Sequence, residues 1–191
     1  MNNPQKLHDD EIPVGLRAKF ADPQWGAERL SAIGVFKCFS IPELTKIYIK
    51  GRIRVLRPAA HAVVEGENSR GVFLILSGSM SVYKTDHSSG GMFRIAYLSE
   101  GQSFGEMSLF DRAPRSATVA ADVSSYLFHL DAKDFESFLS AAGDDVRARF
   151  YKACAEDLSG RFRVLNADYL NSQQLLWKYA LRRSEGGPRS A

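Results

Sequence analysis

One segment, residues 104–119, combines residue types that suit an anion bound beside a sugar; it reads FGEMSLFDRAPRSATV. Gly105 lets the backbone approach a ligand closely, and the four residues from Met107 can form one helical turn whose N–H groups would face a negative group. Arg115, directed by the proline before it, would add a guanidinium that pairs with phosphate. Glu106 would fit such a site by accepting hydrogen bonds from the hydroxyls of a ribose.

Other interpretations of these residues exist. Arg115 alone could form a surface salt bridge, and Glu106 alone could be the carboxylate of a helical turn, but together at this spacing they favour ligand binding. An enzyme on a related barrel, such as a metal-dependent cupin, would need clustered histidine and carboxylate ligands. The four histidines are scattered and form no HxH pair, and neither HExxH nor a Ser-His-Asp elbow is present. We therefore expect no enzyme activity, no catalytic residue, no metal and no cofactor.

The segment lies between two strands of a region, residues 52–130, in which apolar and polar residues alternate with a period of two. Glycines and polar clusters separate these short runs, which indicates an antiparallel sandwich or barrel. Residues 87–91 are expected to form a hairpin loop, because Gly90 and Gly91 can both adopt positive φ.

Helical signals flank the strands. Asp22 followed by proline, and Ser40 with Glu43 in a capping box, begin two helices within residues 22–51. A short helix is predicted to begin after Asp131, and a helix of about 25 residues to begin at Asp144. Gly160 is its weakest point. A shorter helix is predicted over residues 173–183.

The composition of the chain limits the number of domains and the classes of partner. The chain has 191 residues, of which 45% are hydrophobic, and its 25 Lys and Arg against 22 Asp and Glu give a net charge of +3. This suggests one globular domain and a charge too mild to indicate nucleic acid or a membrane surface. Cys38 and Cys154 are far apart, which favours two buried, reduced thiols. No apolar run approaches the roughly 20 residues of a membrane helix, so we expect a cytoplasmic protein with no membrane partner.

Residues 104–119 resemble the phosphate-binding cassette of the cyclic nucleotide-binding domain family, the sensor module of catabolite activator proteins, kinase regulatory subunits and gated channels. The resemblance covers about residues 25–165, since the flanking helices and the turn glycines Gly66, Gly78, Gly101 and Gly105 fall where the family has them. It implies an α+β, mainly β fold: an antiparallel jelly-roll-like β-roll flanked by N-terminal helices and a long C-terminal helix.

The expected organisation follows from this resemblance and from the local signals. It comprises a flexible arm over residues 1–21, a single cyclic nucleotide-binding domain over residues 22–170, and a helical extension with a tail over residues 171–191. Within the domain we expect N-terminal helices at 22–51, the β-roll at 52–130 and C-terminal helices at 131–170.

The resemblance also implies roles for individual residues. Glu106 and the Gly105 backbone would hold the ribose 2′-hydroxyl, and Arg115 would pair with the cyclic phosphate. Ser116 would form a hydrogen bond near the phosphate or the edge of the base. A residue of the long helix would cap the base, with Arg161 the first candidate and Asn166 the second. The full implied set of ligand-binding residues is Val82, Ile95, Ala96, Gly105, Glu106, Met107, Ser108, Arg115, Ser116, Ala117 and Arg161.

The expected function is therefore a cyclic nucleotide sensor, with cAMP as the first candidate ligand and cGMP as the second. A winged helix-turn-helix would need roughly 70 residues after the long helix, so no DNA partner is expected. The output would pass through C-terminal helix movement to an unknown protein effector, or through a homodimer, although the apolar stripe of that helix is not a sustained heptad. The alternative is a β-roll that has lost its ligand and serves as a scaffold, with residues 174–183 docking on a partner.

Overall fold

The computed structural model describes residues 12–86 and 88–185, in two compact units that meet between Phe150 and Tyr151. Eight strands of the first unit form two four-stranded sheets in which all paired neighbours are antiparallel. In sheet order, the first holds β1 (Arg52–Leu56), β8 (Ser125–Asp131), β3 (Gly71–Ser77) and β6 (Ser103–Phe104). The second holds β2 (His61–Val63), β7 (Thr118–Ala121), β4 (Ser79–Thr85) and β5 (Met92–Ser99). The predicted β-roll is confirmed.

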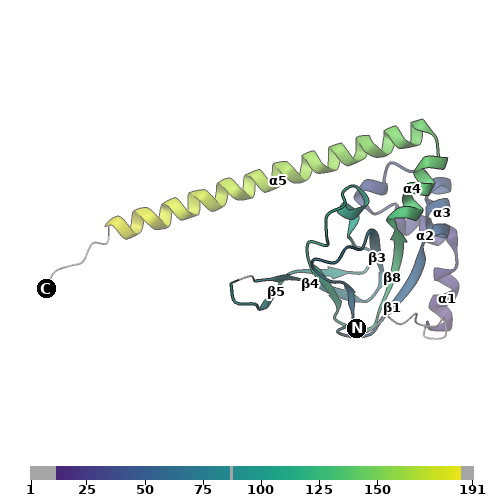
Figure 1. Ribbon diagram of the computed structural model, residues 1–191, viewed down its shortest axis with the longest axis horizontal. Helices are drawn as coiled ribbons and strands as arrows, with labels where there is room; N and C mark the ends of the chain where they lie inside the picture. Colours follow the sequence, from purple (N-terminus) through teal and green to yellow (C-terminus); the bar gives the residue numbers. More distant parts are fainter. Residues whose placement is uncertain (1–11, 87, 186–191) are drawn as a thin grey trace. The chain divides into compact units, whose positions relative to one another are not determined.

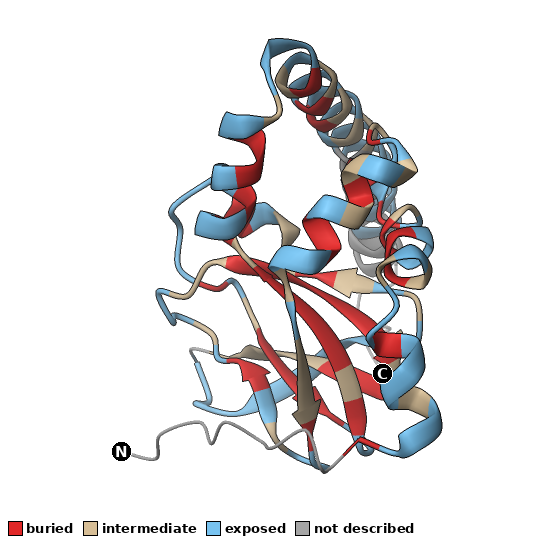
Figure 2. Ribbon diagram, turned by 90° about the vertical axis from the view of Figure 1, so that its right-hand side faces the viewer, coloured by how far each residue is buried: buried red, intermediate tan, exposed pale blue. Residues whose placement is uncertain are grey.

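The core between the sheets is formed by the inward faces of these strands, with Phe73, Met80 and Leu127 almost fully buried. Figure 2 shows the buried residues following the strands, and β3 is buried along nearly its whole length rather than at alternate positions. The first sheet is covered by helices, since α3 (Ile41–Lys50) and α4 (Ala132–Ala141) both contact β8 (Figure 1). The cassette joins β6 of the first sheet to β7 of the second sheet.

The helix starts that were predicted from capping residues are confirmed. Asp22 accepts a hydrogen bond from the N–H of Gln24 at the start of α2 (Pro23–Leu30). Asp131 accepts one from the N–H of Lys133 at the start of α4. Ser40 and Glu43 form the predicted capping box of α3. The predicted hairpin also forms, and Gly90 has φ 71°, but Gly91 does not adopt positive φ.

Residues 14–20 correct the prediction of an N-terminal arm, because they form helix α1 (Val14–Phe20). The helix is held by tertiary contacts that its own sequence does not reveal. Phe20 is buried against Trp25 and Tyr126, and its carbonyl accepts a hydrogen bond from the Tyr48 hydroxyl at 2.8 Å. Residues 1–11 lie outside the described residues.

The C-terminal helix is also longer than predicted. In place of two helices, one helix, α5, runs from Asp144 to Glu185, and Gly160 does not interrupt it. No proline occurs between Asp144 and Glu185, so nothing there forces an end. The predicted boundary between residues 170 and 171 therefore falls inside α5. Within the described ranges, no helix combines the length and apolarity needed to cross a membrane.

Candidate functional site

The cassette begins with a tight turn at Gly105, which follows β6 and starts the 3₁₀ turn η3 (Glu106–Leu109). Gly105 has φ 81°, in the left-handed region that favours glycine. A Cβ at this position would lie 2.5 Å from Nη1 of Arg115 and 2.8 Å from the carbonyl oxygen of Gly71. The glycine therefore allows the backbone to approach the arginine that the cassette carries.

Arg115 is the main feature of the site. Its residue is 7% exposed, and its Nη1 donates to the carbonyl of Gly71 at 3.0 Å and to Oγ of Ser108 at 3.2 Å, while Nε donates to Oγ of Ser69 at 3.1 Å. Burial lowers the pKa of Arg115, yet a guanidinium stays charged at neutral pH. Among the described residues, no carboxylate lies within 4 Å of it, so polar groups orient this buried cation without neutralising it.

Ser108 connects the cassette to β3. Its hydroxyl accepts from the N–H of Gly71 at 2.9 Å and from Nη1 of Arg115, and it donates to the carbonyl of Gly105 at 2.7 Å. Its backbone N–H, which the sequence assigned to an anion cradle, donates to the carbonyl of Gly105 at 3.2 Å within the turn. Support of Arg115 by the side chain of Ser108 was not predicted, because nothing in their spacing shows this contact.

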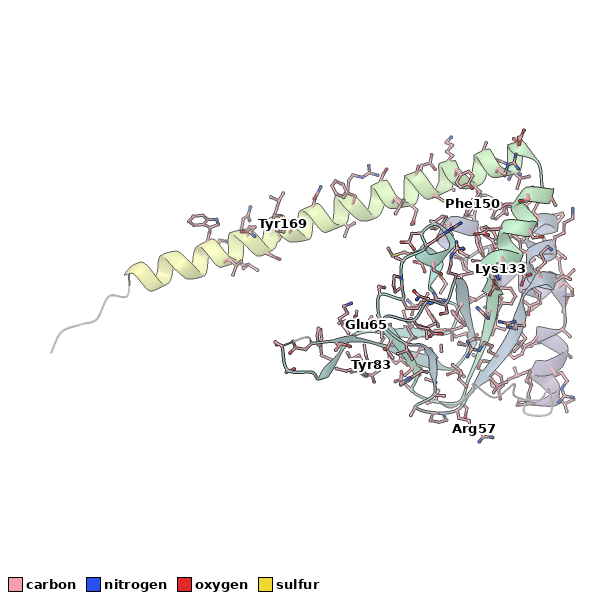
Figure 3. All side chains as sticks on the ribbon, in the orientation of Figure 1. Arg57, Glu65, Tyr83, Lys133, Phe150 and Tyr169 are labelled. Carbon is pink, nitrogen blue, oxygen red and sulfur yellow. The ribbon has the colours of Figure 1, made fainter. Side chains whose placement is uncertain are left out.

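A second group of contacts, also missed from the sequence, fixes the other end of the cassette. Lys84 on β4 donates to the carbonyl of Ser116 at 2.7 Å and pairs with Glu65. Glu65 also accepts from the N–H of Thr85, and its own N–H donates to Oγ1 of Thr118. Hydrogen bonds from Lys84 and Thr85 hold the pKa of Glu65 down to about 2. Figure 3 labels Glu65 beside the strand that carries Tyr83.

Val82, Ile95 and Ala96, which the resemblance implies as the wall of the base pocket, lie on β4 and β5 of the second sheet. Val82 pairs with Ala96 on β5 and with Val119 on β7, which begins directly after Ser116 and Ala117. Ile95 has no partner in the register, because the pairing shifts between Val82 and Tyr83. The fold thus brings this wall to the strand that continues from the cassette.

The sequence model of the cyclic nucleotide-binding domain matches residues 53–142, which contain the cassette and all the strands except the first residue of β1. The chain contains a cyclic nucleotide-binding domain. Residues 104–119 lie inside the matched region. The predicted family membership of this region is confirmed.

Comparison with known proteins places this domain in several kinds of protein. The chain is 31% identical over 128 residues to Glutaminase 1 of Bradyrhizobium diazoefficiens, covering 67% of this chain and 20% of the glutaminase. It is 35% identical over 92 residues to a cAMP-dependent protein kinase regulatory subunit of Mycosarcoma maydis, covering 48% of this chain and 17% of that protein. The chain thus spans a fifth or less of each of these two relatives.

Solved structures show the same fold. A crystal structure of a cyclic nucleotide-binding domain from Methylobacillus flagellatus is 25% identical to this chain, with a TM-score of 0.61 over 74% of this chain and 80% of the other. The agreement extends beyond residues 53–142, since it covers a larger share of the chain than the sequence match does.

The cyclic nucleotide-binding domain is joined to α5 by aromatic contacts. Phe110, which ends η3, stacks on Phe150 at a centroid distance of 5.6 Å. Phe150 in turn packs against Phe39 and Phe135 and is 1% exposed. Arg149 beside it pairs with Glu43 at 2.7 Å. The middle of the cassette therefore contacts the first two turns of the long helix directly.

Two of the sequence predictions concern the base cap. Arg161 and Asn166 both lie on α5 in the unit that begins at Tyr151. The side chain of Arg161 lies outside the described residues, and Asn166 is exposed. Both assignments stay predictions. No group of three or more metal-ligating side chains is found among the residues that the structure describes.

Proposed function

We propose that this chain is a cyclic nucleotide sensor whose ligand is cAMP. The observation that carries the proposal is Arg115, a buried guanidinium in the cassette that has no carboxylate within 4 Å among the described residues. A buried charge is costly unless it is paired, and a cyclic phosphate supplies the missing partner. The similarity to a cAMP-dependent kinase regulatory subunit favours cAMP, with cGMP as the alternative ligand.

The bound nucleotide would use the cassette and the wall together. Arg115 pairs with the cyclic phosphate, Glu106 accepts hydrogen bonds from the ribose hydroxyl, and the backbone of Gly105 stays close to the sugar. The N–H groups around Met107 and Ala117, together with Ser116, would bind near the phosphate. Lys84 fixes the carbonyl of Ser116 and so keeps this end of the cassette in place. The base lies against the wall formed by Val82, Ile95 and Ala96, under a cap from α5.

Calorimetric titration with cAMP and with cGMP tests the proposal. We expect saturable heat with cAMP, and about 100-fold weaker binding after Arg115→Ala because the phosphate loses its buried charge partner. Arg112→Ala is the matched control, since it removes an exposed arginine of the same cassette. The absence of heat with either nucleotide at high micromolar concentration would contradict the proposal and favour the ligand-free scaffold. Equal binding by Arg115→Ala and the parent would show that the site is wrong.

The signal passes from the cassette to α5 through the contact of Phe110 with Phe150. A ligand that contacts the cassette differently in two states shifts their populations by that difference in binding free energy. Movement of Phe110 would then change the packing around Phe150 and the direction of the helix. Spin labels at Lys133 and Gln173 would report this change as a different distance distribution when cAMP is added. Phe110→Ala should bind cAMP within a few-fold of the parent and respond less.

The output involves a second copy of the chain. Along α5, five exposed apolar residues are separated by steps of seven, four, seven and seven residues: Tyr151, Leu158, Phe162, Tyr169 and Leu176. These five side chains are 56–63% exposed. Steps of seven and four residues place these five side chains along one stripe of the helix, which supports pairing of α5 with a second copy. The stripe is not a sustained heptad, since the exposed Val164, Leu170, Leu175 and Trp177 fall outside it.

Light scattering with and without cAMP tests the homodimer. Phe162→Glu places a charge in the apolar stripe and should shift the mass toward the monomer. Val164→Glu is the matched control, because it places the same charge at an exposed apolar position outside the stripe. A monomeric parent at all accessible concentrations would contradict the homodimer and leave a different protein effector as the partner.

A further inference from the structure

A cavity of about 990 Å³ lies in the first unit between the first sheet, β2 and the loop of residues 64–70. Its wall also includes residues at the start of α4. Of all the residues predicted to bind the nucleotide, the cavity wall contains Arg115 alone. This cavity is therefore distinct from the predicted nucleotide site, except that both use the same guanidinium.

The wall of the cavity carries an excess of positive charge. Five of its side chains are cationic and three are acidic: Arg52, Arg54, Arg70, Arg115 and Lys133 against Glu65, Glu67 and Asp131. Arg70 pairs with Glu136 outside the cavity wall, and Glu65 pairs with Lys84. Asp131 accepts a hydrogen bond from the backbone at the start of α4, and the exposed Glu67 accepts one from the N–H of Val64. Cations remain in excess after these pairs are counted.

Arg54 is the least expected of these cations, because it points from β1 into the β-roll. Its guanidinium lies 5.5 Å from the centroid of the Phe73 ring, and that of Arg115 lies 5.6 Å from the same ring. The side chain of Arg54 is half-buried, and its Nη1 donates to the carbonyl of Ala62 at 3.3 Å. Within the described ranges, neither guanidinium has a carboxylate within 4 Å. Two cations that share a partly buried wall favour an anion between them.

His129 gives a second, independent indication of a ligand. The residue is 7% exposed, lines the cavity and stacks on Phe73 with a centroid distance of 4.2 Å. Its Nδ1 is the one buried side-chain nitrogen or oxygen among the described residues that has no hydrogen-bond partner. Arg52 is its register partner across β1 and β8. A buried polar atom without a partner is rare and costly, so a donor or acceptor is missing there.

We propose that this cavity is a second anion site, which binds a phosphate-sized dianion through Arg52, Arg54 and His129 and shares Arg115 with the nucleotide site. Neutral His129 can donate from Nδ1 to a phosphate oxygen, and the arginines supply the compensating charge. The shared use of Arg115 rests on the proposed function, whereas the anion site does not. Because both occupants are negative and use one guanidinium, phosphate in the cavity weakens cAMP binding, and cAMP weakens phosphate binding by the same factor.

Titration of the full chain with inorganic phosphate, at constant ionic strength set with sodium chloride, tests the proposal by calorimetry. We expect binding at millimolar phosphate in the parent, and about tenfold weaker binding in Arg54→Gln because a charge-assisted hydrogen bond is lost. Arg57→Gln is the matched control, since Arg57 is exposed just beyond β1 and does not line the cavity. In phosphate-free buffer, Arg54→Gln should bind cAMP within about threefold of the parent.

The possible outcomes separate this proposal from the proposed function. No phosphate binding by the parent would overturn the second site, while cAMP titration of the same sample would still report on the nucleotide site. Phosphate binding that is unchanged in Arg54→Gln but lost in Arg115→Ala would place the anion in the nucleotide site and also overturn the proposal. If Arg54→Gln does not fold, as judged by circular dichroism, the exposed Arg52→Gln provides the same test.

Discussion

Phe150 and Phe162 lie on the same helix, twelve residues apart, in very different surroundings. Phe150 is 1% exposed and packs against the rings of Phe39, Phe110 and Phe135. Phe162 is 63% exposed. No break in α5 separates them, yet the boundary between the two compact units falls directly after Phe150. Figure 3 labels Phe150 and Tyr169, one on each side of this boundary.

The difference shows that a continuous helix can belong to two parts of a protein. The first two turns of α5 gain their stability from packing against the cyclic nucleotide-binding domain. Helices in proteins usually depend on such packing of an apolar face, and propensity alone contributes little. The remaining turns expose their apolar stripe and need another surface to gain the same stabilisation. The two parts should therefore respond differently to matched substitutions.

The largest effect is expected from Phe150→Ala. Removing this ring leaves a cavity among Phe39, Phe110 and Phe135, and such truncations cost about 3–5 kcal/mol. Phe162→Ala should change the unfolding free energy of the first unit by less than about 0.5 kcal/mol, because its ring is exposed. Urea denaturation measures both values.

The two tryptophans make this measurement specific to each part. Trp25 packs against Phe20 in the first unit, whereas Trp177 lies on α5 and is exposed. In a Trp177→Phe background, fluorescence therefore follows the unfolding of the first unit alone. Similar losses for Phe150→Ala and Phe162→Ala in that background would show that the first unit does not end at Phe150.

Much of the buried part was predictable because its signals are local. The capping box of Ser40 and Glu43 needs residues only three apart, and the strands appear as alternation within short runs. Gly105 and Arg115 were predicted as site residues because the cassette is one continuous segment, and the structure places the Arg115 side chain against the Gly105 backbone. The length of α5 was underestimated, because Gly160 weakens the helix locally and no contact within the sequence shows that the two predicted helices are continuous.

The cavity residues could not be predicted in the same way. Arg54 and His129 are 75 positions apart, and only the pairing of β1 with β8 brings their strands together. The support of Arg115 by Ser69 and Ser108 likewise depends on how β3 passes the cassette. No local signal marks residues 14–20 as a helix either, because the contacts that hold Phe20 come from distant residues.

The buried part should also be the pH-sensitive part. Burial and the nearby charges of Arg52, Arg54 and Arg115 lower the pKa of His129 to about 4 from its ordinary value of 6.5, with Asp131 opposing them. The unfolded chain therefore binds more protons between pH 6.5 and 4, so the stabilisation present above pH 6.5 is lost as the pH falls towards 4. The full loss is on the order of 3 kcal/mol.

Urea denaturation of the first unit at several pH values between 4 and 7 would test this effect. Carboxylates with lowered pKa values, such as Glu43, also lose stabilisation on acidification, so the informative quantity is the difference between the parent and His129→Phe. The phenyl ring keeps the stacking on Phe73 but cannot titrate. Parallel pH profiles for the two proteins would exclude His129 as a source of the dependence.

The smallest expected effects come from replacing one helical glycine by alanine in each of the two parts. A Cβ added at Gly160, within α5, would meet no atom within 4 Å beyond the backbone of its own helix, so Gly160→Ala should stabilise the helix by about 1 kcal/mol. A Cβ on Gly26, also helical, would lie 2.4 Å from the ring of Tyr48, and Gly26→Ala should destabilise the first unit by about 1–3 kcal/mol through overpacking. Circular dichroism melting curves would show opposite shifts. A destabilising Gly160→Ala would mean that another surface covers α5 at this point, because only a close neighbour can oppose the gain in helix propensity.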